Sequence, residues 1–294
     1  MQAGRRGPSL PIFPVLLTAF TCICLAGCVW LFTNSFFLTR YELKDESHCS
    51  DLPLHLRSHT SSPLSPAHSH TSERHRPCWR RGVAEKVVLV IVDALRVDFA
   101  IDATDEKGDV VHTSYTDEFP FFAKLKRDKP DQTEVFRFVA DPPTTTLQRL
   151  KALTTGGLPT FLDAKDNFDS SEIGEDNLIR QLLLAGKRIA FFGDDTWMGL
   201  FPNGSFVRAF PFPSFDVQDL DTVDAGVNEH LPEVIREGDW DVIIAHYLGV
   251  DHAGHTFGPD HSEMRRKRRD VATSLSHLYH LLPNDTLLFV AGDH

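Results

Sequence analysis

The sequence has no excess of positive charge and no internal repeat. Lysine and arginine total 30 residues against 41 aspartates and glutamates, so the 294-residue chain carries a formal net charge of −11 at pH 7. Because binding to a nucleic acid needs a positively charged surface, this balance argues against a nucleic-acid partner. The length allows one large α/β domain or two modest ones.

Cysteine is scarce, and its five residues fall into two groups. Cys22, Cys24 and Cys28 lie in one apolar stretch, where a thiol behaves as a small hydrophobic group. Cys49 and Cys78 flank a polar segment. They can form a disulfide if that side of a membrane is oxidising, and two free thiols are the alternative.

Only one long hydrophobic run is present, at residues 10–32, and it carries no charge and follows Arg5 and Arg6. About 20 apolar residues suffice to cross a bilayer as a helix. We therefore expect residues 1–34 to form an uncleaved transmembrane signal anchor, with the basic N-terminus in the cytosol. The tetrapeptide LAGC at 25–28 leaves a lipoprotein-type cleavage site as the alternative.

A polar segment follows the anchor. Residues 35–84 have low hydrophobicity and include a Ser/His/Pro stretch at 58–77, which predicts a partly disordered lumenal stem. Two glycosylation sequons, at Asn203 and Asn284, are compatible with a lumenal location of the rest of the chain.

The remaining sequence alternates short apolar runs with amphipathic segments. Runs that are apolar throughout are typical of strands buried on both faces of a sheet. We expect an α/β fold with a mainly parallel sheet and flanking helices. The expected strands are 86–92, 188–192, 241–245 and 286–291, and the expected helices are 147–153, 175–185, 223–235 and about 262–281.

Acidic side chains follow three of these four strands. Asp93 comes directly after the first strand, Asp251 follows the third after a short loop, and Asp293 and His294 follow the fourth. Ligands of open parallel sheets bind outside the carboxyl ends of the strands. The sequence therefore predicts that these side chains gather at one edge of the sheet.

Asp251 and His255 are four positions apart in HYLGVDHAGH. They can converge on one ion if the segment turns, and Gly254 permits a tight turn. Carboxylate and imidazole ligands together suit zinc or another first-row divalent ion. For one motif alone, a helix N-cap or an ordinary histidine is the simpler interpretation. The coincidence of such motifs at three strand ends favours a metal site.

A run of three threonines begins the predicted helix at 147–153, in DPPTTTLQRLKALTTG. A helix N-terminus offers free N–H groups and the positive end of the helix dipole, which favour a phosphate. A threonine there can cap the helix. It can instead act as a nucleophile if a metal lowers the pKa of its hydroxyl group.

Together these motifs resemble the alkaline-phosphatase superfamily, most closely its nucleotide pyrophosphatase/phosphodiesterase-like branch. The resemblance implies an alkaline-phosphatase-like catalytic domain over 85–294 that holds two divalent metal ions, Zn²⁺ or else Mn²⁺. It also implies that Thr146 is the nucleophile, because this residue stands ten positions before the glycine of TTG. The implied ligands are Asp93, Thr146, Asp293 and His294 for one ion, and Asp251, His255 and a later histidine for the other.

Within that superfamily, VDALRVDFA, DPPTTTLQRLKALTTGGLPTF, GDDTWMGLFP and HYLGVDHAGH resemble the GPI ethanolamine phosphate transferases. The resemblance implies transfer of phosphoethanolamine from phosphatidylethanolamine to the third mannose of the GPI-anchor precursor, through a phosphothreonine. It implies a location in the endoplasmic reticulum membrane with a lumenal catalytic domain, and a small multi-pass stabilising subunit (PIG-F). A membrane-bound phosphodiesterase and a catalytically inactive truncated product are the alternatives.

Two departures from that family pattern stand out. The family has a Met-Asp pair in the helix after GVDHxGH, where this sequence reads Arg-Asp-Val-Ala at 269–272. The sequence also stops at His294, before the third ligand of the second ion. We therefore expect a fragment truncated at its C-terminus and inactive by itself.

Overall fold

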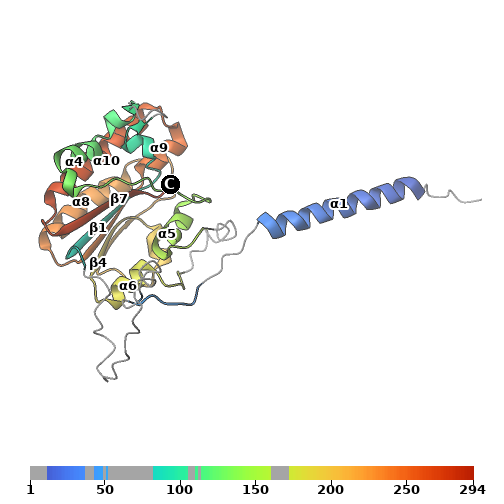
Figure 1. The fold of residues 1–294 in the computed structure, drawn as a ribbon, viewed down its shortest axis with the longest axis horizontal. Helices are drawn as coiled ribbons and strands as arrows, with labels where there is room; N and C mark the ends of the chain where they lie inside the picture. Colours follow the sequence, from blue (N-terminus) through green and yellow to red (C-terminus); the bar gives the residue numbers. More distant parts are fainter. Residues whose placement is uncertain are drawn as a thin grey trace, which may run out of the picture.

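A parallel five-stranded sheet forms the centre of the body, in the strand order β5-β4-β6-β1-β7 (Figure 1). The computed structural model describes residues 12–36, 43–48, 51, 82–104, 110–111, 114–159 and 172–294. The sheet confirms the expected α/β fold. Its strands are β1 (Lys86–Val92), β4 (Ile189–Asp194), β5 (Arg208–Phe212), β6 (Val242–Tyr247) and β7 (Thr286–Gly292).

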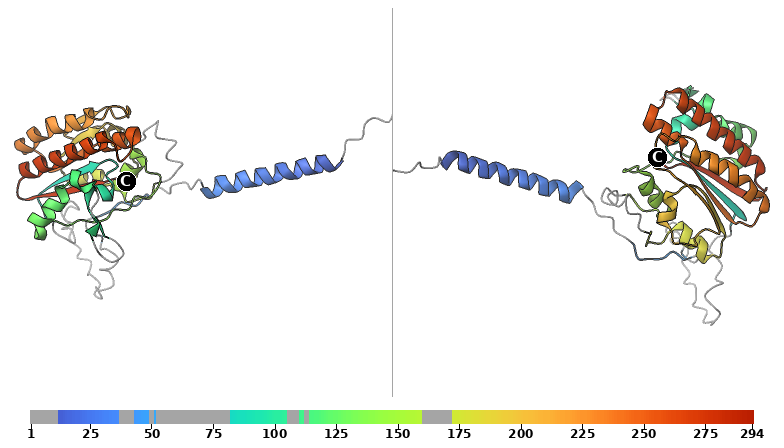
Figure 2. Two further views of the ribbon diagram at one scale, coloured as in Figure 1. Left: turned by 90° about the horizontal axis from the view of Figure 1, so that it is seen from above. Right: turned by 180° about the vertical axis from the view of Figure 1, so that it is seen from behind.

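Helices cover both faces of this sheet (Figures 1 and 2). One face packs against α3 (Val97–Ala100), α4 (Phe121–Asp128), α8 (Thr222–Glu237), α9 (Gly249–Phe257) and α10 (Ser262–Leu281). The other face packs against α5 (Thr146–Thr155), α6 (Leu178–Leu184) and α7 (Thr196–Leu200). A short antiparallel pair, β2 (Ala103–Thr104) and β3 (Val110–Val111), and two 3-10 turns, Thr116–Glu118 and Pro130–Gln132, complete the described elements.

The strand side chains alternate between two hydrophobic clusters. Val88 and Val90 of β1 belong to the cluster under α8 and α10, whereas Ile91 belongs to the cluster under α5 and α7. Every residue of β4 and β6 is buried. Because successive side chains point to opposite faces, a strand covered on both sides is mainly apolar, which explains the continuous apolar runs of the sequence.

The strand register aligns the carboxyl ends of the three central strands. Val92, the last residue of β1, pairs with Tyr247 of β6 on one side and with Gly292 of β7 on the other. Asp93 then donates its backbone N–H to the carbonyl of Tyr247 over 2.9 Å. The residues that follow β1, β6 and β7 consequently meet at one edge of the sheet.

Two expectations about local structure were wrong. The short loop with a turn at Gly254 is instead helix α9, whose geometry places residues four apart on the same face without any turn. Strand β5 was not expected, because RAFPF contains Pro211 and its side chains are alternately half-buried and exposed. Both features are typical of an edge strand, which needs neither a full set of N–H donors nor two covered faces.

Helix α1 (Ile12–Phe36) stands apart from the body in every view (Figures 1 and 2). Residues 12–35 have a mean hydropathy of 2.3 with no buried side chain, so this helix is long and apolar enough to cross a membrane. Most of the predicted stem, with Cys49, Cys78 and the stretch at 58–77, lies outside the described residues. The boundaries at 34 and 84 stay predictions.

Candidate metal centre

All six residues predicted for the site lie at the carboxyl edge of the sheet. The ends of β1 and β7 and the helices α5 and α9 carry them, which is why they are far apart in the sequence. Asp93 follows β1, Asp293 and His294 follow β7, Asp251 and His255 lie on α9 after β6, and Thr146 is the first residue of α5.

Thr146 is directed at Asp93. Its hydroxyl group donates a hydrogen bond to Oδ2 of the Asp93 carboxylate over 3.1 Å. The residue in the N-cap position is Thr145, whose side chain makes no capping hydrogen bond. Thr146 itself therefore does not occupy the N-cap position, and its oxygen lies where the first-strand carboxylate can contact it.

The His294 ring lies between three carboxylates. Its Nδ1 atom is 3.1 Å from Oδ1 of Asp293 and 3.5 Å from Oδ1 of Asp93, and its Nε2 atom is 3.8 Å from Oδ1 of Asp251. Ligand atoms of Asp93, Asp251 and His294 all lie within 4.8 Å of one another. Two carboxylate oxygens and one imidazole nitrogen at this spacing could hold a divalent ion.

His255 lies at the outer rim of this group. Its Nε2 atom is 3.4 Å from Oδ1 of Asp251, one helical turn earlier on α9, and its side chain is 67% exposed. An incoming ligand can therefore reach His255 from solvent, whereas Asp93 and Asp293 are completely buried.

The turn after β1 positions Asp293. Ala94 has a positive φ of 56°, which is unusual for a residue other than glycine and turns its N–H toward Oδ1 of Asp293, 3.1 Å away. Gly292 makes this approach possible, since a Cβ atom there would lie 2.4 Å from the carbonyl oxygen of Leu95. Arg149 of α5 donates from Nε to the Asp293 carbonyl over 2.6 Å.

The donor set fits a metal ion. Among the described residues, buried Oδ1 of Asp93 and buried Oδ2 of Asp293 have no hydrogen-bond partner. A buried carboxylate oxygen without a partner is costly, and three carboxylates side by side repel one another. A divalent cation would contact the unpartnered carboxylate oxygens and would neutralise the repulsion between the three carboxylates.

The pKa values reflect this crowding. Burial, assisted by the charge of Asp293, raises the pKa of Asp93 to about 7. Burial also raises the pKa of Asp251. Burial alone would lower the pKa of His294, but its hydrogen bond to Asp293 and the neighbouring negative charges raise it. These three shifts reduce the net negative charge of the cluster. Burial alone would raise the pKa of Asp293, but the hydrogen bond from His294 and its charge lower it.

A second cluster, around His246, lies behind Asp93. Oδ2 of Asp93 is 3.4 Å from Nε2 of His246 on β6, whose Nδ1 accepts a hydrogen bond from the indole of Trp197 over 3.0 Å. Asp93, Asp194 and His246 also have the spacing of metal ligands, but all three are buried. A histidine inside the apolar run of β6 was the available signal. Through its contact with Asp93, His246 is positioned to orient a candidate metal ligand.

His252, the other histidine of HYLGVDHAGH, faces away from the carboxylates. Its ring nitrogens lie 2.7 Å from the carbonyl oxygen of Asp219 and 3.1 Å from that of Ser214. It therefore joins α9 to the loop after β5.

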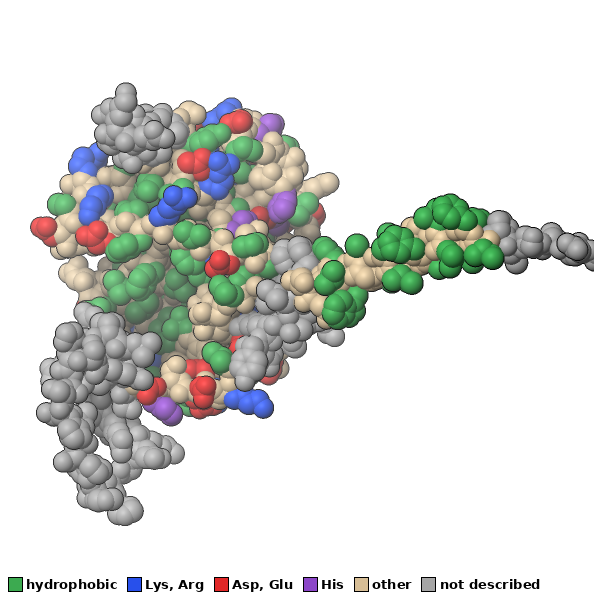
Figure 3. All heavy atoms as spheres, turned by 45° about the vertical axis from the view of Figure 1, so that its right-hand side comes forward, with side chains coloured by type: hydrophobic (Ala, Val, Ile, Leu, Met, Phe, Trp, Pro, Cys, Tyr) green, Lys and Arg blue, Asp and Glu red, His purple; other side chains and the backbone are tan. Residues whose placement is uncertain are grey.

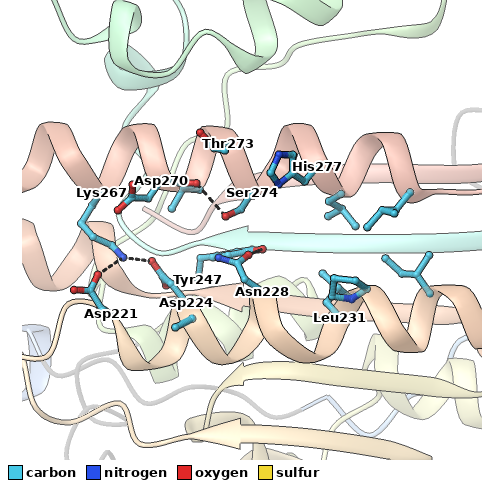
Figure 4. A pocket seen from close by; sticks show the side chains of 16 residues that line it. Asp221, Asp224, Asn228, Leu231, Tyr247, Lys267, Asp270, Thr273, Ser274 and His277 are labelled. Carbon is cyan, nitrogen blue, oxygen red and sulfur yellow. Dashed lines mark hydrogen bonds and ion pairs between the residues drawn. The ribbon is translucent and has the colours of Figure 1, made fainter.

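A pocket of about 450 Å³ lies elsewhere, between α8 and α10 (Figure 4). Within it, Nζ of Lys267 is 2.7 Å from Oδ2 of Asp224 and 3.1 Å from Oδ1 of Asp221. The other oxygen of Asp224 accepts the N–H groups of Leu248 and Gly249. This ion pair thus holds the start of α9, the helix that carries Asp251 and His255.

Comparison with known proteins places this fold in a class. Residues 173–294 match the family model of type I phosphodiesterase / nucleotide pyrophosphatase. Murine ectonucleotide pyrophosphatase/phosphodiesterase 5 shares the fold, with a TM-score of 0.50 and 19% identity over 71% of this chain and 57% of that one. The chain is a member of the alkaline phosphatase superfamily.

Relatives found by sequence similarity identify a particular group of enzymes within this superfamily. The catalytic subunit of human GPI ethanolamine phosphate transferase 3 is 46% identical over 95% of this chain, and the Saccharomyces cerevisiae enzyme is 38% identical over 96%. The chain is a homologue of GPI ethanolamine phosphate transferase 3. It spans about a quarter of the length of these relatives, since it covers 25% of each.

Proposed function

We propose that the full-length protein transfers phosphoethanolamine from phosphatidylethanolamine to the third mannose of a GPI-anchor precursor, with Thr146 as the nucleophile. The observation that carries this proposal is the hydrogen bond from the Thr146 hydroxyl to Asp93, made at a helix N-terminus among carboxylates and a histidine. The relatives, which are GPI ethanolamine phosphate transferases, support the choice of reaction.

Two divalent ions complete the proposed site, zinc in the first place and manganese as the alternative. When bound, they would lower the pKa of the threonine hydroxyl group and neutralise the phosphate oxygens. Asp93, Thr146, Asp293 and His294 would hold one ion. Asp251 and His255 would hold the other, together with a histidine beyond residue 294.

In the first step, Thr146 loses its hydroxyl proton and attacks the phosphorus atom of phosphatidylethanolamine. The bond from Oγ1 to phosphorus forms, and the bond from phosphorus to the diacylglycerol oxygen breaks. Diacylglycerol leaves after its oxygen takes up a proton, which balances the proton that Thr146 has lost. The free N–H groups in the first turn of α5 face the phosphate and favour its negative charge.

In the second step, a mannose hydroxyl group of the GPI precursor attacks the phosphothreonine. The new bond from the mannose oxygen to phosphorus replaces the bond to Oγ1 of Thr146, which takes back a proton. Because the group is first transferred to the protein, the kinetics should be of the ping-pong type.

The proposed setting is the lumenal side of the endoplasmic reticulum membrane. Helix α1 would cross the membrane, and both substrates are membrane lipids. Asn203 and Asn284 are exposed, so both sequons are accessible to glycosylation. A small multi-pass subunit, PIG-F, is the proposed stabilising partner.

The test compares Thr146→Ala with Thr145→Ala in the full-length protein. Thr145 is a matched control because it precedes Thr146 and its side chain makes no capping bond. Thr146→Ala should abolish transfer while the metal content stays near two ions, and Thr145→Ala should keep transfer. Transfer retained by Thr146→Ala would exclude this residue as the nucleophile.

The match to a phosphodiesterase family model favours one alternative, hydrolysis of the phosphothreonine by water. Product analysis separates the two reactions, since free phosphoethanolamine indicates hydrolysis and a modified glycolipid indicates transfer. For the 294-residue chain by itself, fewer than two bound ions and no turnover would favour a catalytically inactive product.

A further inference from the structure

Exposed apolar side chains flank the candidate site on two sides. Phe136 and Phe138 precede α5 and are 82% and 53% exposed, and Phe215 and Val217 follow β5 and are 79% and 45% exposed. We call these four residues the apolar rim. Figure 3 shows hydrophobic side chains beside histidine and acidic side chains on one face of the body. Exposed apolar groups gathered on both sides of a polar site are typical of an interaction surface.

The first half of the rim is fixed to the site through Arg149. The guanidinium group of Arg149 lies 5.5 Å from the ring centre of Phe138 and donates a hydrogen bond to the carbonyl of Asp141 over 3.2 Å. The same side chain donates to the carbonyl of Asp293. One arginine therefore joins the exposed phenylalanine to a candidate metal ligand.

The second half of the rim is fixed to the site through α9. Thr256 donates a hydrogen bond to the carbonyl of Val217 over 2.9 Å, and His252 contacts the carbonyl of Ser214. Both donors lie on the helix that carries Asp251 and His255. Phe215 is thus held on a loop attached at both sides to the metal-binding helix.

The body is also held close to the apolar helix α1. The N–H of Leu43 donates to Oε1 of Glu175, and the N–H of Ser47 donates to Oδ2 of Asp176, just before α6. Phe36, the last residue of α1, is seven residues before Leu43. Seven residues span at most about 25 Å, whatever path the chain takes.

We propose that the apolar rim contacts the surface of a phospholipid bilayer and holds the candidate site at the level of the lipid headgroups. One exposed cation, Arg137, and one exposed anion, Asp216, lie between the residues of the rim. These opposite charges suit zwitterionic headgroups. The inference rests on the proposed function, because a lipid substrate is what makes this contact useful. A headgroup could then reach Thr146 while its acyl chains stay in the bilayer.

The test is fluorescence quenching by brominated acyl chains in phosphatidylcholine vesicles that contain the full-length protein. Tryptophan is introduced in separate Phe136→Trp and Phe215→Trp variants. Each variant is compared with the same protein without the added tryptophan. The fluorescence of the native tryptophans, including Trp30 of α1, can then be subtracted. Val207→Trp is the matched control, since Val207 is 57% exposed but lies at the opposite edge of the sheet, before β5.

The added fluorescence should fall at least twofold for both rim variants and stay unchanged for the control. Rim tryptophans quenched no more than the control would overturn the proposal. So would blue-shifted but unquenched emission, which would show that another part of the protein covers the rim. Metal content near two ions checks that each variant is folded, and Val217→Trp replaces a variant that fails this check.

Quenching measures contact with the bilayer and does not measure the transfer of phosphoethanolamine. The proposed bilayer contact and the proposed reaction can therefore be contradicted independently. Unquenched rim variants in a protein that still transfers phosphoethanolamine would overturn the bilayer contact alone. Quenched rim variants in a protein that transfers nothing would overturn the proposed reaction alone.

Discussion

The indole N–H of Trp197 donates a hydrogen bond to Nδ1 of His246 over 3.0 Å. An indole nitrogen can only donate, so Nδ1 must be the unprotonated nitrogen of the ring. The ring proton then lies on Nε2, which faces Oδ2 of Asp93 at 3.4 Å. Trp197 thus sets both the orientation and the tautomer of a histidine that contacts a candidate ligand.

Replacing Trp197 by phenylalanine should therefore weaken metal binding. Without the indole donor, His246 can place its proton on Nδ1 and lose its contact with Asp93. Partners of ligands typically contribute 10–100-fold to metal affinity, so we expect a loss of about tenfold, measured by competition with a chelator.

The control for this variant is Trp240→Phe. Trp240 is equally buried, but it packs in the cluster under α8 and α10. Both variants lose a similar volume from the core, so a similar loss of stability is expected. An equal loss of metal affinity in both would show that Trp197 acts only through packing.

Replacing Lys267 by methionine should destabilise the fold strongly. The Lys267 side chain is 2% exposed, and its removal leaves the buried Asp224 carboxylate without its cation. Breaking one partner of a buried pair costs about 3–5 kcal/mol, measurable by denaturant unfolding. The double variant Lys267→Met/Asp224→Asn should lose less than the sum of the two single variants. Additive losses would contradict a direct pairing.

Removal of metal should lower the thermal stability of the protein. Without a cation, the carboxylates of Asp93, Asp251 and Asp293 repel one another in a mostly buried cluster. Zinc at 100 times its dissociation constant should add about 2.7 kcal/mol to the free energy of unfolding. Calorimetry with and without a chelator measures this difference.

The variant Asp251→Asn tests whether this carboxylate contributes to the repulsion and to metal binding. It removes one negative charge, so its metal-free form should be at least as stable as the metal-free parent. It also removes a proposed ligand, so its gain in stability from zinc should be smaller. A gain equal to that of the parent would exclude Asp251 as a ligand.

The pH dependence of stability should change when Asp241 is replaced by asparagine. The hydrogen bond from Arg188 lowers the pKa of the Asp241 carboxyl group. The pair therefore stabilises the fold above the ordinary carboxyl pKa of about 3.9, and this stabilisation is lost as the pH falls through the lowered value. Because the pair is partly exposed, we expect a loss of about 0.5–1 kcal/mol at pH 7.

Denaturant unfolding from pH 7 down to pH 3 measures this effect. The difference between Asp241→Asn and the parent should shrink toward the acid end of that range. Asp131→Asn changes an exposed acid that follows α4, and it serves as the control. A difference that grows on acidification would contradict the assignment.

Much of the sheet could be predicted because its strands are covered on both faces. The expected strand at 86–92 has the same bounds as β1, since a strand covered on both faces forms a nearly continuous apolar run. Strand β4 extends two residues beyond its expected end because Gly193 and Asp194 continue the ladder although neither is apolar. Hydropathy therefore located the strands but not their polar ends.

The candidate ligands could be proposed from the sequence because each follows a strand or begins a helix. Residue order at strand ends is a local property, so Asp93, Asp251 and Asp293 were all recognisable. Their mutual distances depend on the strand order β6-β1-β7, which no local pattern specifies.

Local hydropathy and spacing were sufficient to predict the apolar helix near the N-terminus, the α/β alternation and the types of side chain at the sheet edge. Only the tertiary structure decided that α9 replaces a loop, that His246 and Trp197 contact the site behind Asp93, and that Lys267 holds Asp224. Those contacts join residues 43 to 153 positions apart or depend on packing between elements. The physical reason is that burial and pairing of polar groups are decided by which elements pack together.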